Sequence, residues 1–510
     1  MLRKAPLHRV ACLALLFSLL PVDMNASALF KPALTNLSGG VDAVSLAVAD
    51  VNGDGKLDVV VSNHFACATC YTNGAVGILI GNGDGSFQAA RTYDSGGSGA
   101  AGVAVADVNG DGKPDVVVAN FCAAGTDCGG DSKTGSVAVL LGNGDGTFRP
   151  AQVFSTGNQS AYLAVGDFNA DGKLDVAVAD GCGGCGNRNI AILLGSGDGT
   201  FRSPQTYDLP KEPLGIAVGD ITGDGRLDIL VGLEGTGGEQ NGTSAVLFGN
   251  GDGTFSAPQT LYPAGAYPVL ADINGDGKPD LVVATPCGDP RCKKGGVGVL
   301  LGNGDGTFQA LQNYSSGGYD GDFVTVGDLN RDGKSDVFVS NYSGKVGTLL
   351  GVGDGMLSPV QLSNPGLGGP FSMAIGDVNG DGKPDLIVAI YDLNNDGPNG
   401  GVGVLLNNTF WTTTTALTST PNPSVQGQRV TLTATVTTQG SIAPTGKVLF
   451  KNGISTIGSA TLIGGVATLA KTNLPVGTLS LTAKYQGDVN SAKSTSPGLV
   501  QVVNPPTGQP

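Results

Sequence analysis

The stretch Asp50-Val-Asn-Gly-Asp-Gly-Lys-Leu-Asp58 decides the fold, because the chain contains its pattern seven times. The pattern has Asp at positions 1, 5 and 9, a polar residue at position 3, and Gly at position 6. Position 3 is Asn except in the fourth copy, where it is Thr222. A period of roughly fifty residues is typical of repeat architectures. The copies span residues 50–58, 107–115, 167–175, 220–228, 272–280, 328–336 and 377–385.

Short apolar runs flank each copy. In the first copy, Leu46-Ala-Val-Ala precedes the stretch and Val59-Val-Val follows it. Short runs rich in β-branched residues indicate strands. The nine-residue stretch is therefore predicted to be the loop of a β-hairpin, and the EF-hand helices that accompany a similar spacing are not expected.

The oxygen-bearing side chains of this loop match the ligands that calcium prefers. Calcium takes six to eight oxygen ligands in a flexible shell, and Gly at position 6 permits a tight turn. Metal-free Asx turns are the alternative, but three converging carboxylates repel one another without a counter-ion. We therefore predict about seven Ca²⁺ ions, with these ligands: Asp50, Asn52, Asp54, Asp58, Asp107, Asn109, Asp111, Asp115, Asp167, Asn169, Asp171, Asp175, Asp220, Thr222, Asp224, Asp228, Asp272, Asn274, Asp276, Asp280, Asp328, Asn330, Asp332, Asp336, Asp377, Asn379, Asp381 and Asp385.

A second motif gives each repeat its other two strands. It is Leu79-Ile-Gly-Asn-Gly-Asp-Gly-Ser-Phe87 in the first repeat, where the glycines predict a hairpin turn and Phe87 is expected to begin the fourth strand. Four strands per repeat predict an all-β propeller of seven blades. The N-terminal strand, from Phe30 to Thr35, is expected to complete the seventh blade beside residues 402–406, because no residues remain for an irregular eighth blade.

These two motifs resemble the FG-GAP/VCBS repeats of integrin-α-like β-propellers, over roughly residues 30–410. The resemblance implies a propeller fold and calcium in the hairpin loops. It does not identify a ligand, because propellers of this kind serve in adhesion, as lectins and in some enzymes.

The two ends of the chain differ from the repeats. Residues 1–28 are expected to be a secretory signal peptide, with a basic start, an apolar run from Val10 to Leu20 and small residues at Ala26-Ser-Ala28. The propeller is assigned to 29–411, and the protein is expected to be secreted without inserting into a membrane. Threonine-rich alternation over 412–503 resembles a bacterial Ig-like β-sandwich, which ends in Tyr485-Gln-Gly-Asp488, and 504–510 is a predicted disordered tail. Trp411 is expected to pack between the two domains.

The chain is acidic, with a formal net charge of −15. Calcium in the loops would neutralise most of that charge. An acidic chain argues against nucleic-acid binding, which needs a basic surface.

Eight cysteines follow the signal peptide in four close pairs. In an exported protein an even number of cysteines favours disulfides, although zinc and redox chemistry are the alternatives for the two C-x-x-C pairs. Each pair is expected to stiffen the connection between the second and third strands of its blade. The pairs are Cys67/Cys70, Cys122/Cys128, Cys182/Cys185 and Cys287/Cys292.

Long connections of this kind are expected on the face opposite the calcium hairpins, where binding usually occurs. Aromatic residues cluster there: Phe65, Tyr71, Phe121, Tyr342 and Tyr391. The sequence therefore favours a binding or adhesion module for a glycan or a surface protein. The alternatives are a polysaccharide lyase or hydrolase, and a purely structural envelope protein. No catalytic residue is assigned, because His64 is the only histidine after the signal peptide and no Ser/His/Asp arrangement is visible.

Overall fold

The computed structural model describes residues 28–67, 73–124, 134–181, 188–234, 242–261, 265–285, 295–319, 321–366, 368–391, 400–438, 443–488 and 490–506. Within these ranges the chain forms strands and no helices, and no helix of the length and apolar character needed to cross a membrane is found. The predicted signal peptide up to residue 27, Tyr71 and the end of the tail lie outside the described residues, as do Cys70, Cys128, Cys182, Cys185, Cys287 and Cys292. So does the stretch Asp392-Leu-Asn-Asn-Asp-Gly397, which repeats the first six positions of the acidic pattern.

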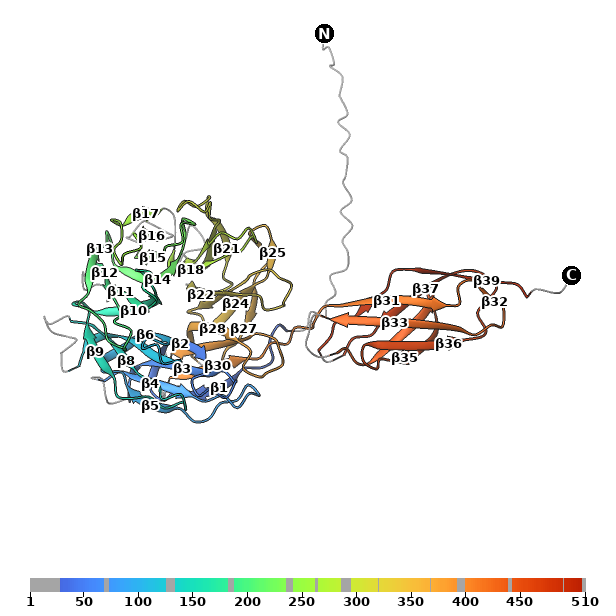
Figure 1. Cartoon of the computed structure of the whole chain (residues 1–510), viewed down its shortest axis with the longest axis horizontal. Coiled ribbons are helices and arrows are strands. Elements are labelled where there is room, and N and C mark those ends of the chain that lie inside the picture. The colour runs from blue at the N-terminus through green and yellow to red at the C-terminus, as the bar shows by residue number, and fades with distance from the viewer. Residues whose placement is uncertain are drawn as a thin grey trace, which may run out of the picture.

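Seven four-stranded antiparallel sheets are arranged around a central opening (Figure 1). Six of these sheets take their strands in chain order from the inside outward, as the repeat predicts. The first three sheets are β2 (Val41–Ala49), β3 (Asp58–Phe65), β4 (Ala75–Leu79) and β5 (Arg91–Asp94); β6 (Gly97–Ala106), β7 (Asp115–Ala123), β8 (Ser136–Leu140) and β9 (Gln152–Ser155); and β10 (Ser160–Gly166), β11 (Asp175–Asp180), β12 (Asn189–Leu193) and β13 (Gln205–Asp208).

The next three sheets repeat this order. They are β14 (Pro213–Gly219), β15 (Asp228–Leu233), β16 (Thr243–Leu247) and β17 (Gln259–Leu261); β18 (Ala266–Ala271), β19 (Asp280–Thr285), β20 (Gly296–Leu300) and β21 (Gln312–Ser315); and β22 (Gly321–Gly327), β23 (Asp336–Asn341), β24 (Lys345–Leu349) and β27 (Gln361–Ser363). A small hairpin of β25 (Gly351–Gly353) and β26 (Met356–Leu357) precedes β27.

The seventh sheet joins the two ends of the ring. It contains β28 (Gly369–Gly376), β29 (Asp385–Tyr391) and β30 (Gly401–Leu405), and its fourth strand is β1 (Leu34–Leu37). Leu34 pairs with Val404, so the N-terminal strand covers the edge that β30 would otherwise expose. The strand starts later than predicted, because Phe30 instead bridges to Asn407 and its side chain is buried.

The fourth strand of each sheet also starts later than predicted. Phe87 does not begin β5 but bridges back to Gly81, and Gln88 donates its N–H to the carbonyl of Ile80. The same bridge recurs in the next four repeats. The phenylalanine therefore closes the glycine turn, and the outer strand begins only after the chain has left that turn.

Apolar side chains fill the space between neighbouring sheets. The second and third strands carry runs such as Val59-Val-Val61 and Val116-Val-Val118, all fully buried because both faces of these strands are covered. Each cluster takes residues from two adjacent sheets, for example Val60 and Val118. Burial of this kind stabilises the ring by roughly 25 cal/mol per Å² of apolar surface.

The C-terminal strands form a two-layer sandwich (Figure 1). Its core contains fully buried Leu432, Phe450, Leu481 and Tyr485. One sheet is β31 (Thr413–Thr420), β33 (Val430–Thr438) and β36 (Val466–Lys471); the other is β32 (Ser424–Val425), β39 (Leu499–Asn504), β37 (Gly477–Tyr485), β34 (Lys447–Asn452) and β35 (Ser455–Thr461), with β38 (Ser494–Thr495) paired to β37.

Asp488 fastens one end of the sandwich. Its carboxylate accepts N–H bonds from Thr445 at 2.7 Å, Asn490 at 2.8 Å and Ser491 at 2.6 Å. Burial opposes ionisation of Asp488, but these hydrogen bonds outweigh it and lower the pKa to about 2, below the ordinary 3.8.

The lowered pKa of Asp488 makes the stability of the chain depend on pH. The ionised form stabilises the fold above about pH 4, and this contribution is lost as the pH falls towards 2. Asp488→Asn should therefore be less stable than wild type at pH 7, and the difference should shrink between pH 4 and 2. Urea unfolding of both proteins at pH 7, 4 and 2 measures it. A difference that stays constant with pH would contradict this role of the carboxylate.

Trp411 packs between the two bodies, as predicted. Its ring is buried, and the guanidinium of Arg331 lies over it, 4.6 Å from the ring centroid. On the sandwich side, the backbone N–H of Trp411 donates to the carbonyl of Asn490, and the backbone carbonyl of Trp411 accepts the N–H of Ala492. Arg331 belongs to the sixth acidic loop, so the sandwich contacts the loop-bearing face of the ring.

Candidate metal loops and binding face

The acidic stretch forms a tight loop between the first two strands of each sheet. In the first copy, the carboxylate of Asp50 accepts the N–H groups of Gly53 and Gly55, both at 2.7 Å. The amide oxygen of Asn52 accepts the N–H of Asp54 at 2.8 Å. The bond from the position 6 N–H to the position 1 carboxylate recurs in all seven copies, at 2.7–2.8 Å. Gly at position 6 is needed because this residue has a positive φ, +79° at Gly55.

The aspartate at position 9 has a second structural role that the sequence analysis missed. Asp175 begins β11, is fully buried, and accepts the N–H of Phe168 at 2.9 Å and of Gly195 at 2.7 Å. It thereby joins the acidic loop to the glycine turn of the same sheet. The other copies repeat the arrangement, with acceptors Asp58, Asp115, Asp228, Asp280, Asp336 and Asp385.

Burial raises the pKa of these position 9 aspartates, and the charges of positions 1 and 5 add to the effect. The pKa of Asp58 is raised first by burial and further by Asp54 and Asp50, against the lowering effect of its two backbone hydrogen bonds. The pKa reaches about 6 at Asp336 and about 7 at Asp385. The carboxylates of one loop therefore repel one another, and a nearby cation would relieve that repulsion.

The donor types of the loops fit calcium. They supply only hard oxygens, and an oxygen that accepts an N–H retains a second lone pair. Among the described residues, no group of three His, Cys, Asp or Glu side chains lies close enough together to hold a metal ion. The ligand oxygens at positions 1, 3 and 5 instead face N–H groups of their own loop, so calcium binding stays a prediction.

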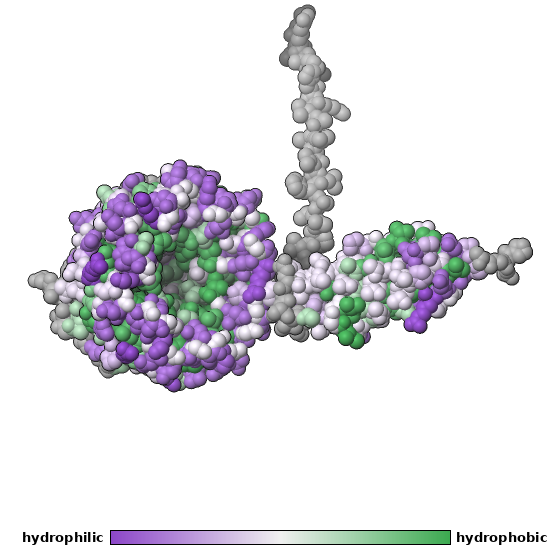
Figure 2. Space-filling view, in the orientation of Figure 1, coloured by the Kyte–Doolittle hydropathy of each residue, from purple (hydrophilic) through white to green (hydrophobic). Residues whose placement is uncertain are grey.

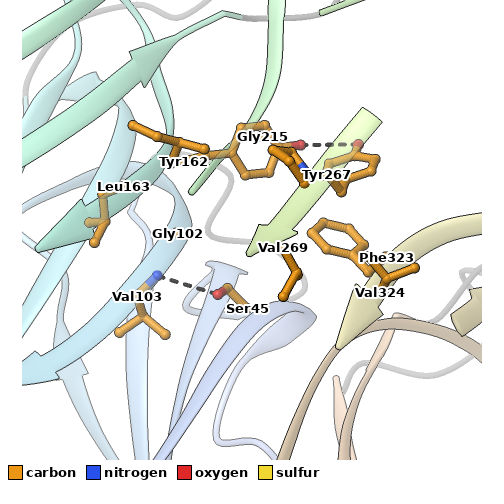
Figure 3. A pocket seen from close by; sticks show the side chains of 12 residues that line it. Ser45, Gly102, Val103, Tyr162, Leu163, Gly215, Tyr267, Val269, Phe323 and Val324 are labelled. Carbon is orange, nitrogen blue, oxygen red and sulfur yellow. Dashed lines mark hydrogen bonds between the residues drawn. The ribbon is translucent and has the colours of Figure 1, made fainter. Parts of the chain in front are cut away.

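Residues that stand five positions before six of the seven acidic loops line the central channel (Figure 3). These residues line a cavity of about 130 Å³. Small and aromatic residues alternate at these positions around much of the ring. Figure 2 shows hydrophobic residues gathered around the same opening. In chain order the six positions are Ser45, Gly102, Tyr162, Gly215, Tyr267 and Phe323. In the seventh sheet the aromatic residue is Phe371, one residue further from its loop.

Small residues in this ring make room for the large ones. A Cβ atom on Gly215 would lie 2.7 Å from the Cα of Tyr267, so the blade that carries Gly215 cannot take a larger residue there. Tyr267 itself has a positive φ of 51°. The inner strands shift register at this level, for instance between Ser160 and Tyr162, which turns the following side chain towards the channel.

The aromatic residues form a continuous arc across the channel. The hydroxyl groups of Tyr162 and Tyr267 are 3.2 Å apart, and Tyr267 stacks on Phe323 with ring centroids 4.0 Å apart. The ring centroids of Phe323 and Phe371 are 4.5 Å apart, and those of Phe371 and Tyr391 are 6.4 Å apart. Burial raises the pKa of Tyr162 to about 12, so its hydroxyl stays protonated at neutral pH. The arc is thus a neutral, amphipathic surface.

This arc lies at the end of the ring away from the acidic loops. Tyr162 is near the start of β10, whereas the loop begins at Asp167, directly after the strand ends. Five residues of strand span about 16 Å. The side chains that could contact a ligand and those that could hold calcium are therefore on opposite faces.

The five aromatic residues expected at the face opposite the acidic loops lie in different surroundings. Phe65 and Phe121 flank the imidazole of His64, with ring centroids 4.6 and 5.5 Å away. Burial lowers the pKa of His64, which keeps it neutral in this cluster. Tyr342 and Tyr391 line a second cavity, and Tyr71 lies outside the described residues. The channel aromatics were missed, although Tyr162, Tyr267 and Phe323 each stand five residues before their loop, which was a signal in the sequence.

Of the eight cysteines predicted to form disulfides, two lie in the described residues. Cys67 and Cys122 are both disulfide-bonded, and the remaining six cysteines lie outside the described ranges, so the predicted pairing stays a prediction. Cys122 belongs to β7 itself, because that strand extends further than expected into the connection.

Comparison with protein families finds two kinds of domain. The FG-GAP-like repeat matches residues 65–118, 122–178, 168–231, 236–283, 272–339 and 328–388, and the FG-GAP repeat matches 43–77 and 99–140. The bacterial Ig-like domain (group 3) matches 417–504. The predicted family and the all-β propeller with a C-terminal Ig-like domain are thereby confirmed.

Individual proteins are similar over part of the chain. Integrin alpha-IIb of Mus musculus is 32% identical over 218 residues, which is 38% of this chain and only 20% of the integrin. The crystal structure of BBS1N in complex with ARL6DN has 12% identity and a TM-score of 0.45 over 74% of this chain and 97% of that one. A mutant of NanB sialidase from Streptococcus pneumoniae has 13% identity and a TM-score of 0.40, over 75% of this chain and 71% of that one.

Proposed function

The chain belongs to the FG-GAP repeat family, and from this premise we propose that it is a secreted, calcium-stabilised binding module. Its ligand is a glycan or a surface protein, held at the mouth of the central channel. The acidic loops stabilise the ring from the opposite face. The Ig-like domain, which contacts that loop-bearing face through Trp411, leaves the mouth open.

The aromatic arc is the observation that carries this proposal. Tyr162, Tyr267, Phe323 and Phe371 come from four different sheets, yet their rings meet at one end of the channel. Aromatic rings with a polar edge are enriched where proteins bind partners, because they bury a large area with little loss of conformational entropy.

A binding screen with matched variants tests this function. The mature protein is applied to a glycan array and to a panel of extracellular proteins, next to Phe371→Ala and Tyr267→Phe. We expect Phe371→Ala to weaken the selected ligand at least tenfold, whereas Tyr267→Phe, which keeps the ring, retains most of the affinity. The control is Phe410→Ala, because Phe410 is an aromatic residue that is 41% exposed and is not among the residues that line the channel. Unchanged binding by Phe371→Ala would place the ligand elsewhere.

A further inference from the structure

A second cavity opens between the sixth and seventh sheets, beside the channel mouth. Its volume is about 220 Å³, which is below the roughly 300–1,000 Å³ of pockets that hold drug-sized molecules. It is therefore suited to one small chemical group. The residues that line it are Asp322, Tyr342, Gly369, Pro370, Phe371 and Tyr391.

Three aromatic rings form the walls of this cavity. Phe371 and Tyr391 lie on the neighbouring strands β28 and β29, with ring centroids 6.4 Å apart and ring planes inclined by 35°. Tyr342 comes from the turn between β23 and β24 and is 57% exposed, so it stands at the rim. Gly369 and Pro370 add no polar side chain.

Asp322 is the only acidic or basic residue among the described residues that line the cavity. Its negative charge acts on the hydroxyl groups of the neighbouring Tyr162 and Tyr267. Burial raises the pKa of both tyrosines, and the charge of Asp322 raises it further. The chain as a whole is acidic, with a formal net charge of −15. A cationic group would therefore be attracted both from a distance and at contact.

We propose that this cavity is an aromatic cage that binds a quaternary ammonium group. Such a group gains from the negative faces of Tyr342, Phe371 and Tyr391 and from the carboxylate of Asp322. A methylated ammonium presents apolar methyl groups to the aromatic walls while keeping its positive charge. It has no N–H donor that must give up its water or find an acceptor on entering the cavity, whereas a guanidinium or a primary ammonium has several.

This inference rests on the proposed function, because it names a chemical group that the binding face recognises. Three sources share that group: a free small molecule such as choline, the headgroup of a phosphatidylcholine lipid, and a trimethyl-lysine side chain of a protein. All three present the same cation to the cage, so the cation itself is tested first.

Titration calorimetry of the calcium-loaded, full-length mature protein with tetramethylammonium and choline tests the cage. We expect both cations to bind, and Asp322→Asn and Tyr391→Ala each to weaken binding about tenfold or more. Tyr342→Phe keeps the ring and should bind within about threefold of wild type. The neutral isostere of choline, 3,3-dimethylbutanol, is the matched control for charge and should bind at least tenfold more weakly.

Several outcomes would overturn the cage. These are no binding of either cation by folded wild type, equal binding of the neutral isostere, or unchanged affinity in Asp322→Asn and Tyr391→Ala variants that melt like wild type. Phosphatidylcholine vesicles, compared with phosphatidylglycerol vesicles, and a trimethyl-lysine peptide, compared with its unmodified form, then identify the source. The titration needs no macromolecular ligand, so the cage can fail while the channel mouth still binds a partner, and the reverse.

Discussion

Chelation of calcium with EGTA is expected to lower the free energy of unfolding by ~10–19 kcal/mol relative to 10 mM calcium. Extracellular calcium modules bind with a Kd of about 10⁻⁴–10⁻³ M. At 10 mM calcium, a site that forms only in the folded chain then contributes about 1.4–2.7 kcal/mol, and seven such sites act together. The physical reason is the repulsion among the carboxylates of each loop, which the ion removes.

Metal analysis and thermal melts with and without EGTA measure this effect. Trp411 provides a local signal, because it is the only tryptophan and Arg331 of the sixth loop lies over its ring. Its fluorescence should change as calcium is withdrawn. A melting temperature that EGTA leaves unchanged would identify the loops as metal-free turns.

A matched pair of variants assigns the ligands. Asp54→Ala should lose one calcium ion of about seven. Asp84→Ala should lose none, because the carboxylate of Asp84 only closes the glycine turn by accepting the N–H and hydroxyl of Ser86. Equal calcium contents in the two variants would contradict the assignment of Asp54 as a ligand.

Asp175→Ala is expected to cost ~2–6 kcal/mol even when EGTA is present. The substitution leaves the N–H groups of Phe168 and Gly195 without their acceptor, and each buried unpaired N–H costs about 1–3 kcal/mol. Asp175→Asn keeps one acceptor oxygen and should lose about half as much. Urea unfolding of the three proteins in EGTA measures the difference.

The same experiment in calcium separates the two roles of position 9. An additional loss in calcium would come from the missing ligand, because the hydrogen-bond loss is already present in EGTA. If Asp175→Ala were as stable as wild type in EGTA, position 9 would act only through the ion, and the proposed fastening of the loop to the glycine turn would be wrong.

The repeats predicted the strands well because a recognisable turn motif lies next to each strand in the sequence. The acidic stretch marks the first hairpin, and the glycine turn after Leu79 marks the second. Even the pairing of the two chain ends could be predicted by counting strands. The errors concern where strands begin, because that depends on contacts that the motif does not show. Phe87, for example, bridges to Gly81 before the outer strand begins.

The channel mouth could not be predicted in the same way. Tyr162 and Tyr267 are 105 residues apart, and no local pattern shows that their hydroxyl groups meet. Asp175 likewise contacts Gly195, which belongs to the next turn of its sheet. The first contact depends on the closed ring, which fixes the distance between sheets, and the second depends on the fold of one sheet, which brings its two turns together.

The pairing of β1 with β30 has a consequence for the order in which the protein can be made. Residue 34 leaves the ribosome long before its partner, residue 404, has been synthesised. During that time the first strand has no place in any sheet, while the blades between the two ends can already form. Assembly of the ring is therefore completed by its N-terminal strand. A chain that stops before residue 401 would keep six complete sheets and the paired strands β28 and β29, but β29 and β1 would both lack their shared partner β30.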